Sequence, residues 1–152
     1  MPDSTMTKTI FLSTTREVVW SFLTEQDKLA QWFHPSDGPL VEGQKYELRE
    51  KQSDGSFHKV CWGTVVSMDK PNSMEWTFTV GPLNGAMTSV NWNLEASNGG
   101  TRLTMTHSGI DEAAGEAALG LLLALDKGWD EHFASLRNAT VAESETAAHE
   151  CA

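Results

Sequence analysis

The sequence predicts an α+β domain in which a curved antiparallel sheet of about six strands wraps around a long C-terminal helix. Three observations support this fold class. Apolar residues recur at every second position over residues 44–107, as in half-buried strands. The breaks between these runs are short and rich in turn residues, which favours antiparallel neighbours. After Gly109 the apolar spacing changes to three and four, which indicates a helix that covers the sheet.

The N-terminal segment predicts a short strand over residues 8–13 followed by a helix. Thr14 and Glu17 have capping-box spacing ahead of an apolar run that begins at Val18. A first helix is therefore expected to start at Thr14.

A second short helix is predicted in the stretch "DKLAQWFHP". Leu29, Trp32 and Phe33 fall at i, i+3 and i+4, so they share one helix face. Pro35 ends the helix and biases His34 towards an extended conformation. The stretch is interpreted as a structural clasp in which the two aromatic side chains close the helix onto the sheet. The alternative is that Trp32 or Phe33 lines the mouth of a cavity.

Five strands then form a meander with one apolar face. The turn sequences between them are Asp54-Gly55, Pro71-Asn72, Asn84-Gly85 and Asn98-Gly99-Gly100. The residues expected to face the core, strand by strand, are Tyr46 and Leu48; Val60, Trp62, Thr64, Val66 and Met68; Met74, Trp76, Phe78 and Val80; Val90, Trp92 and Leu94; and Leu103, Met105 and His107.

The last element is predicted to be one long helix across the apolar face of the sheet. Acidic residues at 111, 112 and 116 suit the positive N-terminal end of a helix. From about residue 140 the sequence is rich in Ala and Glu and lacks aromatics, which predicts a single domain over 1–139 and a flexible acidic tail over 140–152. The apolar stripe consists of Leu122, Leu125, Trp129, Phe133 and Leu136.

Length and charge restrict the classes of partner. The chain has 152 residues, enough for one domain, and a formal net charge of -10. Such a charge repels phosphate backbones and anionic lipids, so neither nucleic acid nor a membrane is expected as a partner. The longest apolar run, residues 117–125, is far shorter than the roughly 20 residues of a membrane helix. No signal-peptide pattern is found at the N-terminus, and a cytosolic location is expected. The oligomeric state stays open.

No metal, cofactor or catalytic motif is found. Cys61 and Cys151 lack the spacing of a zinc site or disulfide framework. The five histidines show no metal-ligand spacing, and both the glycine-rich phosphate loop and the nucleophile elbow are absent. We therefore expect no bound metal, no cofactor and no catalytic set.

A ligand cavity between sheet and helix is the main functional prediction. Three tryptophans are expected on the inner face of successive strands, opposite a helix that carries Gly115, Gly120 and Gly128. These glycines either bring the helix close to the sheet or leave room for a ligand. The alternative is that the aromatic side chains simply pack a core. The candidate ligand-binding residues are Tyr46, Trp62, Trp76, Trp92, Met105, His107, Leu121, Leu122, Leu125 and Trp129.

His107 is the most informative polar residue of the predicted inner face. It either hydrogen-bonds a ligand or acts as a general base, or it caps the last strand near Ser108 and Gly109. Tyr46 and Glu50 share the inner parity of their strand and are further polar candidates, although Glu50 lies near the strand end.

Three segments together resemble a known family. "STTREVVWSFLTEQDKLAQWFHP", "GGTRLTMTHSGI" and "GWDEHFASLRN" resemble the activator of Hsp90 ATPase homologue family, within the START/Bet v 1-like superfamily, over roughly residues 8–139. The resemblance implies a helix-grip fold with a hydrophobic cavity, and it implies no shared catalytic set. Residues that match recurring positions of the family are Val19, Trp20, Trp32, Phe33, His107, Gly109, Gly128 and Trp129.

Three hypotheses of function follow. The first is a carrier or sensor that binds a small hydrophobic molecule. The second, implied by the resemblance, is a protein that contacts an Hsp90-type chaperone. The third is an enzyme acting on a polyketide-like substrate, with His107 as proton shuttle and Tyr46 positioning an oxygen.

Overall fold

The computed structural model describes residues 5–34, 36, 38–51, 53–80, 83 and 86–151, without the side chains of 51, 57, 58, 111, 112, 117 and 142–151. Its elements in chain order are β1 Met6–Leu12, α1 Arg16–Thr24, α2 Gln26–Trp32, β2 Lys45–Lys51, β3 Phe57–Asp69, β4 Ser73–Val80, β5 Thr88–Ser97, β6 Gly100–Ser108, α3 Ile110–Ala114, a 3₁₀ turn Gly115–Ala117, and α4 Ala118–Cys151.

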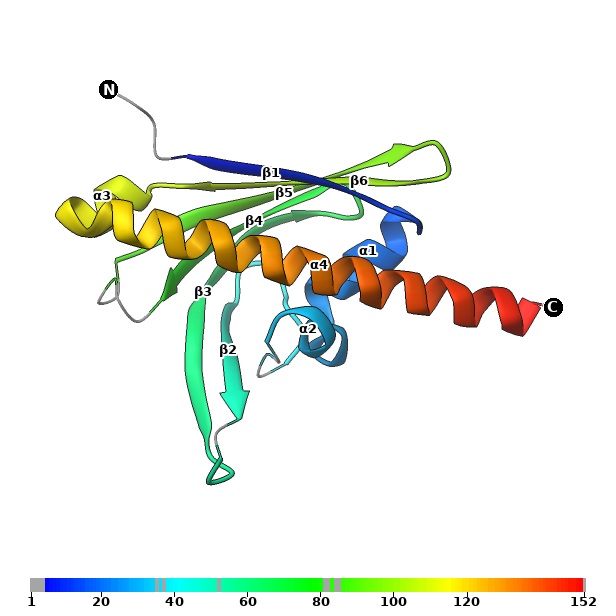
Figure 1. Cartoon of the computed structure of the whole chain (residues 1–152), viewed down its shortest axis with the longest axis horizontal. Coiled ribbons are helices and arrows are strands. Elements are labelled where there is room, and N and C mark those ends of the chain that lie inside the picture. The colour runs from blue at the N-terminus through cyan, green and yellow to red at the C-terminus, as the bar shows by residue number, and fades with distance from the viewer. Residues whose placement is uncertain are drawn as a thin grey trace.

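The strands form one six-stranded antiparallel sheet in the order β1-β6-β5-β4-β3-β2. The predicted meander is therefore confirmed, and β1 adds to it by pairing with β6. Figure 1 shows α4 running across one face of this sheet, while β2 and β3 bend away from the other strands. Helices α1 and α2 lie on the same side as α4, and α2 packs against it. The α+β fold with a curved sheet around a long helix is thus confirmed.

The inner face was predicted correctly on four of the five meander strands. Strict alternation places large side chains of these strands under the helices, where they lose nearly all contact with water. Trp76, Trp92 and Met105 are fully buried at the centre of the sheet. The other buried members are Tyr46, Leu48, Met74, Phe78, Val90, Leu94, Leu103 and His107.

The prediction for β3 was wrong in the middle of the strand, although Met68 packs against the core and Val60 lies on the inner side, because the strand carries apolar side chains on both faces. Its buried residues are Cys61, Gly63 and Val65. Trp62 lies on the opposite face, half-buried, with the Lys59 ammonium 4.2 Å from its ring centroid. Val66 is 47% exposed. The register shifts against β2 between Lys59 and Cys61, and against β4 after Val65, so alternation along the strand does not continue through either break.

The helix boundaries differ from prediction by about a residue. Thr15, rather than Thr14, is the N-cap of α1 and accepts a hydrogen bond from the Val18 backbone N–H at 3.3 Å. Helix α2 ends at Trp32, followed by Phe33 as C-cap. Pro35 and the Asn84-Gly85 turn lie outside the described residues.

The C-terminal helix is interrupted once, which the sequence analysis did not predict. Gly115 adopts a φ of +57°, so the short helix α3 ends there and α4 begins after a 3₁₀ turn. Helix α4 then continues past residue 140 to Cys151. Thr140 is buried and Val141 is 38% exposed. The expected tail is helical in its backbone, and its flexibility stays a prediction. No helix in the described part of the chain has the length and apolar character needed to span a bilayer.

Candidate functional site

An apolar pocket lies between the first half of α4 and the strands β3 and β4. Its volume is about 100 Å³. Two residues that follow α2 close one side of it. The lining residues are Phe33 and His34; Val60 and Cys61; Phe78 and Val80; and Ala124, Leu125, Gly128, Trp129 and His132.

The pocket exists because the first half of α4 stands off from the sheet. A side-chain carbon at Gly128 would meet nothing within 4 Å, and the same holds at Gly120. Of the two readings of these glycines, close approach to the sheet is therefore wrong. Leu119 and Leu123 are 69% and 65% exposed, so α4 buries little apolar surface over residues 118–123. Gly128 leaves space inside the pocket, whereas Gly120 is on the exposed side.

Two histidines supply most of the polarity of the pocket. The ring centroids of His34 and His132 are 5.3 Å apart in an edge-on arrangement. His132 Nδ1 lies 3.3 Å from the Trp32 backbone oxygen. Desolvation lowers the pKa of both histidines, and the nearby His34 charge lowers that of His132 further. Both imidazoles are therefore mainly neutral at pH 7.

The floor of the pocket includes the Cys61 side chain. It is 1% exposed, and burial raises the pKa of its thiol. Because the thiolate is disfavoured there, Cys61 acts as a small apolar wall residue rather than as a nucleophile.

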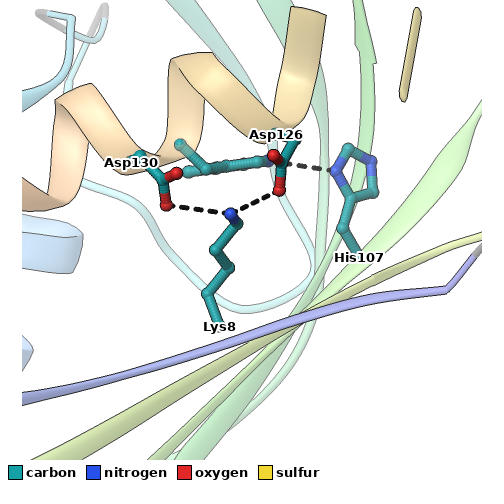
Figure 2. A network of polar contacts seen from close by, with 5 residues as sticks. Lys8, His107, Asp126 and Asp130 are labelled. Atoms are coloured by element: carbon teal, nitrogen blue, oxygen red, sulfur yellow. Dashed lines mark hydrogen bonds and ion pairs between the residues drawn. The ribbon is translucent and has the colours of Figure 1, made fainter. Parts of the chain in front are cut away.

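His107 lies next to this pocket but does not open into it. Trp129 Nε1 donates a hydrogen bond to His107 Nδ1 at 3.2 Å, a contact drawn in Figure 2. His107 Nε2 therefore carries the proton and donates to Thr88 Oγ1 at 2.7 Å. Thr88 in turn donates to the Phe78 backbone oxygen at 2.6 Å.

Both ring nitrogens of His107 are thus occupied by protein groups. Burial lowers the pKa of His107 to about 4. The predicted cap near Ser108 and Gly109 is wrong in its partners, because Thr88 and Trp129 bind the ring instead. The proposed proton shuttle has no ring nitrogen available for a substrate.

The side chain of Tyr46 is likewise bonded and packed within the core. Its hydroxyl donates to the Thr77 backbone oxygen at 2.7 Å, and burial raises its pKa well above the ordinary value. Its ring packs against Trp76 with centroids 5.4 Å apart. The second polar group of the enzyme hypothesis is therefore a core residue with a satisfied hydroxyl.

The structure separates the predicted ligand-binding residues into three groups. Leu125 and Trp129 line the pocket. Leu121 and Leu122 are half-buried on α4 without lining it, and Trp62 faces away from the core. The remaining candidates, which are packed in the core, are Tyr46, Trp76, Trp92, Met105 and His107.

Several lining residues were missed, although one signal was present in the sequence. Residues 125, 128, 129 and 132 follow the spacing i, i+3, i+4 and i+7, so His132 shares the face of Leu125 and Trp129. Val60 was expected on the inner face of β3, whereas the contribution of Cys61 could not be found in this way, because it depends on which side chains of β3 face the helix.

The stretch "DKLAQWFHP" divides between core and pocket. Trp32 is 2% exposed, and its Nε1 donates to the Phe22 backbone oxygen at 2.7 Å, as a structural clasp requires. Phe33 and His34 instead line the pocket. In the described part of the chain, no three His, Cys, Asp or Glu side chains gather as metal ligands do.

Solved structures with the same fold come from several bacteria. They include NE0264 from Nitrosomonas europaea, with 16% identity and a TM-score of 0.73 over 95% of this chain and 99% of that one. CalU16 from Micromonospora echinospora has 18% identity and a TM-score of 0.70 over 96% and 82%. Aha1 from Colwellia psychrerythraea, solved as a dimer in solution, has 19% identity and a TM-score of 0.69 over 90% and 95%.

At these identities the likeness shows the fold. No curated protein matches the sequence of this chain. The model of the activator of Hsp90 ATPase homolog 1-like protein family matches residues 13–140, which is most of the chain, and the chain belongs to that family.

Proposed function

We propose that this protein binds a small hydrophobic or aromatic molecule in the pocket under α4, as a carrier or sensor. The observation that carries the proposal is the apolar space opposite Gly128, walled by Phe78, Leu125 and Trp129. An empty apolar space inside a protein costs stability, and a matching ligand recovers the lost contacts.

The size of the pocket restricts the ligand. An apolar cavity of about 150 Å³ holds one benzene ring, whereas drug-sized ligands use roughly 300–1,000 Å³. A pocket of about 100 Å³ with an open mouth therefore suits a compact molecule whose end reaches outwards. A larger ligand requires the first half of α4 to move away from the sheet.

A pair of glycine substitutions on α4 tests the proposal. Gly128→Leu fills the pocket, whereas Gly120→Leu adds the same side chain on the exposed side of the same helix. Both changes remove a helix glycine, which controls for the gain of up to about 1 kcal/mol in helix propensity. We expect Gly128→Leu to weaken binding of toluene and indole at least tenfold, and Gly120→Leu to bind as wild type.

Isothermal titration calorimetry gives the affinity in each variant. Equal affinities in the two variants would place the ligand elsewhere and contradict the proposal.

Contact with an Hsp90-type chaperone is a second candidate function, favoured by membership of the activator of Hsp90 ATPase homolog 1-like family. The ATPase rate of the Hsp90 from the same organism, measured with and without this protein, tests it. A rate that does not change removes this candidate. If Gly128→Leu still stimulates the ATPase, the chaperone contact is independent of the pocket.

A further inference from the structure

The polar groups of the pocket are concentrated on one side. His34 follows α2 and His132 comes from α4, and their rings are 5.3 Å apart at the mouth. Phe33 packs beside both rings, with its centroid 4.6 Å from that of His132 and 5.0 Å from that of His34. The opposite wall is formed by apolar groups. A ligand that fills the pocket therefore presents one end to apolar walls and the other end to two imidazoles.

The hydrogen bond to Trp32 fixes the tautomer of His132. A backbone carbonyl oxygen only accepts, so His132 Nδ1 carries the proton and donates to it at 3.3 Å. In the neutral ring Nε2 then holds a lone pair, and a second proton turns Nε2 into a donor. Within the described residues, neither His132 Nε2 nor either ring nitrogen of His34 has a protein hydrogen-bond partner.

The surrounding charged groups influence the protonation state of His34 and His132. Glu50 from β2 raises the pKa of His34, and Glu131 from α4 raises that of His132. Desolvation is the largest influence on both rings and outweighs these carboxylates, and His34 opposes the protonation of His132. An additional negative charge placed directly between the rings reverses this balance, because it offsets desolvation at short range.

We propose that the ligand of this pocket is a compact amphipathic acid, with its apolar body against Leu125 and Trp129 and its carboxylate between His34 and His132. The inference rests on the proposed function, because it names the chemical class bound in that same pocket. On binding, a carboxylate and one proton from solvent convert a neutral imidazole into an imidazolium, which donates its N–H to the carboxylate oxygen. The overall charge of -10 repels anions at long range, so recognition depends on these local donors.

Three probes with the same ring test the head group on the full chain: phenylacetate, toluene and benzylamine. Calorimetry at pH 6 and pH 8, in two buffers of different ionisation enthalpy, measures affinity and proton uptake together. We expect phenylacetate to bind at least tenfold more tightly than toluene at pH 6, with uptake of up to one proton. This advantage falls at least tenfold by pH 8, because linked uptake of one proton changes affinity by up to tenfold per pH unit, and therefore by up to about a hundredfold over the two units. The affinity for toluene stays constant with pH.

Substitution of the histidines identifies the groups responsible. His132→Asn keeps an amide N–H towards the Trp32 oxygen and removes Nε2, while His34→Asn removes the other ring. In each variant the ratio of phenylacetate affinity to toluene affinity is expected to fall at least tenfold. The ratio separates loss of carboxylate binding from any change in the apolar walls, because a change in the walls affects the affinities for phenylacetate and toluene alike.

The outcomes distinguish the two proposals. If toluene binds and phenylacetate has no advantage, the acid head group is wrong while the apolar pocket stands. Tighter binding of benzylamine than of phenylacetate shows that Glu50 and Glu131 dominate the mouth, and this also overturns the inference. If none of the three probes binds to the wild-type protein, the proposed function fails together with the inference.

Discussion

The interface between α4 and the sheet has two halves, residues 118–128 and residues 129–140, which differ in how completely they are packed. In the second half, Trp129, Phe133 and Leu136 are at most 4% exposed, and Trp129 stacks on Phe133 with centroids 5.6 Å apart. In the first half, Leu119 and Leu123 point to solvent, and Gly128 leaves space over β3 and β4. One continuous helix therefore contributes core packing at one end and a pocket at the other. The apolar character of the helix residues alone does not show which half packs the core and which half borders the pocket.

Trp129 joins the two halves. Its ring lines the pocket, contacts Trp92 and Phe133, and is held by the hydrogen bond to His107. The buried histidine thus positions one wall of the candidate site without touching its interior.

The largest expected effect compares the same substitution in the two halves. Leu136→Ala removes a fully buried side chain, so the free energy of unfolding should fall by about 2–5 kcal/mol. Leu123→Ala removes a side chain that is 65% exposed and should change it by at most about 0.5 kcal/mol. Urea denaturation followed by circular dichroism measures both values. Equal losses in the two variants would show that the first half of α4 is as well packed as the second.

The second effect is the pH dependence that arises from His107. Its pKa is about 4 in the folded protein and near 6.5 in the unfolded chain, so the unfolded chain binds more protons between these values. Stability is complete above pH 6.5 and is lost as pH falls towards 4, by roughly 3 kcal/mol for this group.

The variant His107→Asn isolates this contribution from those of the other titrating groups. We expect its free energy of unfolding to decline less steeply than that of the wild type between pH 7 and pH 4.5. Parallel curves for the two proteins would mean that His107 is already protonated in the fold, with Trp129 no longer donating to it.

The smallest expected effect concerns the contact of α4 with the edge strand β1. Lys8 Nζ lies 2.5 Å from Asp126 Oδ1 and 2.8 Å from Asp130 Oδ1, and both contacts are drawn in Figure 2. Desolvation lowers the pKa of Lys8, but the hydrogen bonds and charges of the two aspartates raise it above its ordinary value. Both aspartates are more than half exposed, so the pair contributes at most about 1 kcal/mol.

Lys8→Met should therefore lower the free energy of unfolding slightly at low salt, and the difference from wild type should vanish in 1 M NaCl. Asp126→Asn and Asp130→Asn are the matched single-charge controls. A loss that persists in high salt would show that Lys8 stabilises the protein through packing of its stem instead of its charge.

Predictions from the sequence were accurate where the fold depends on local periodicity. Alternation places Trp76, Trp92 and Met105 inside, and the i, i+3, i+4 stripe of α4 ends at the buried Leu136. The predictions were wrong where local rules break, as between the two register shifts of β3, where Trp62 faces away from the core and Cys61 lines the pocket. The break at Gly115 was missed for a similar reason, because the sequence does not distinguish a glycine at positive φ from a glycine inside a helix.

The fold class, the order of the elements, the inner faces of four strands and the family could all be predicted from the amino-acid sequence. Each of these depends on spacing along the chain, which is visible without coordinates. Only the tertiary structure decided which groups meet. It placed Thr88 and Trp129 on the two nitrogens of His107 and brought His34 beside His132. Such encounters depend on the curvature of the sheet and the stand-off of α4, which no local pattern encodes. The candidate site is therefore a property of the packing of the two halves of α4.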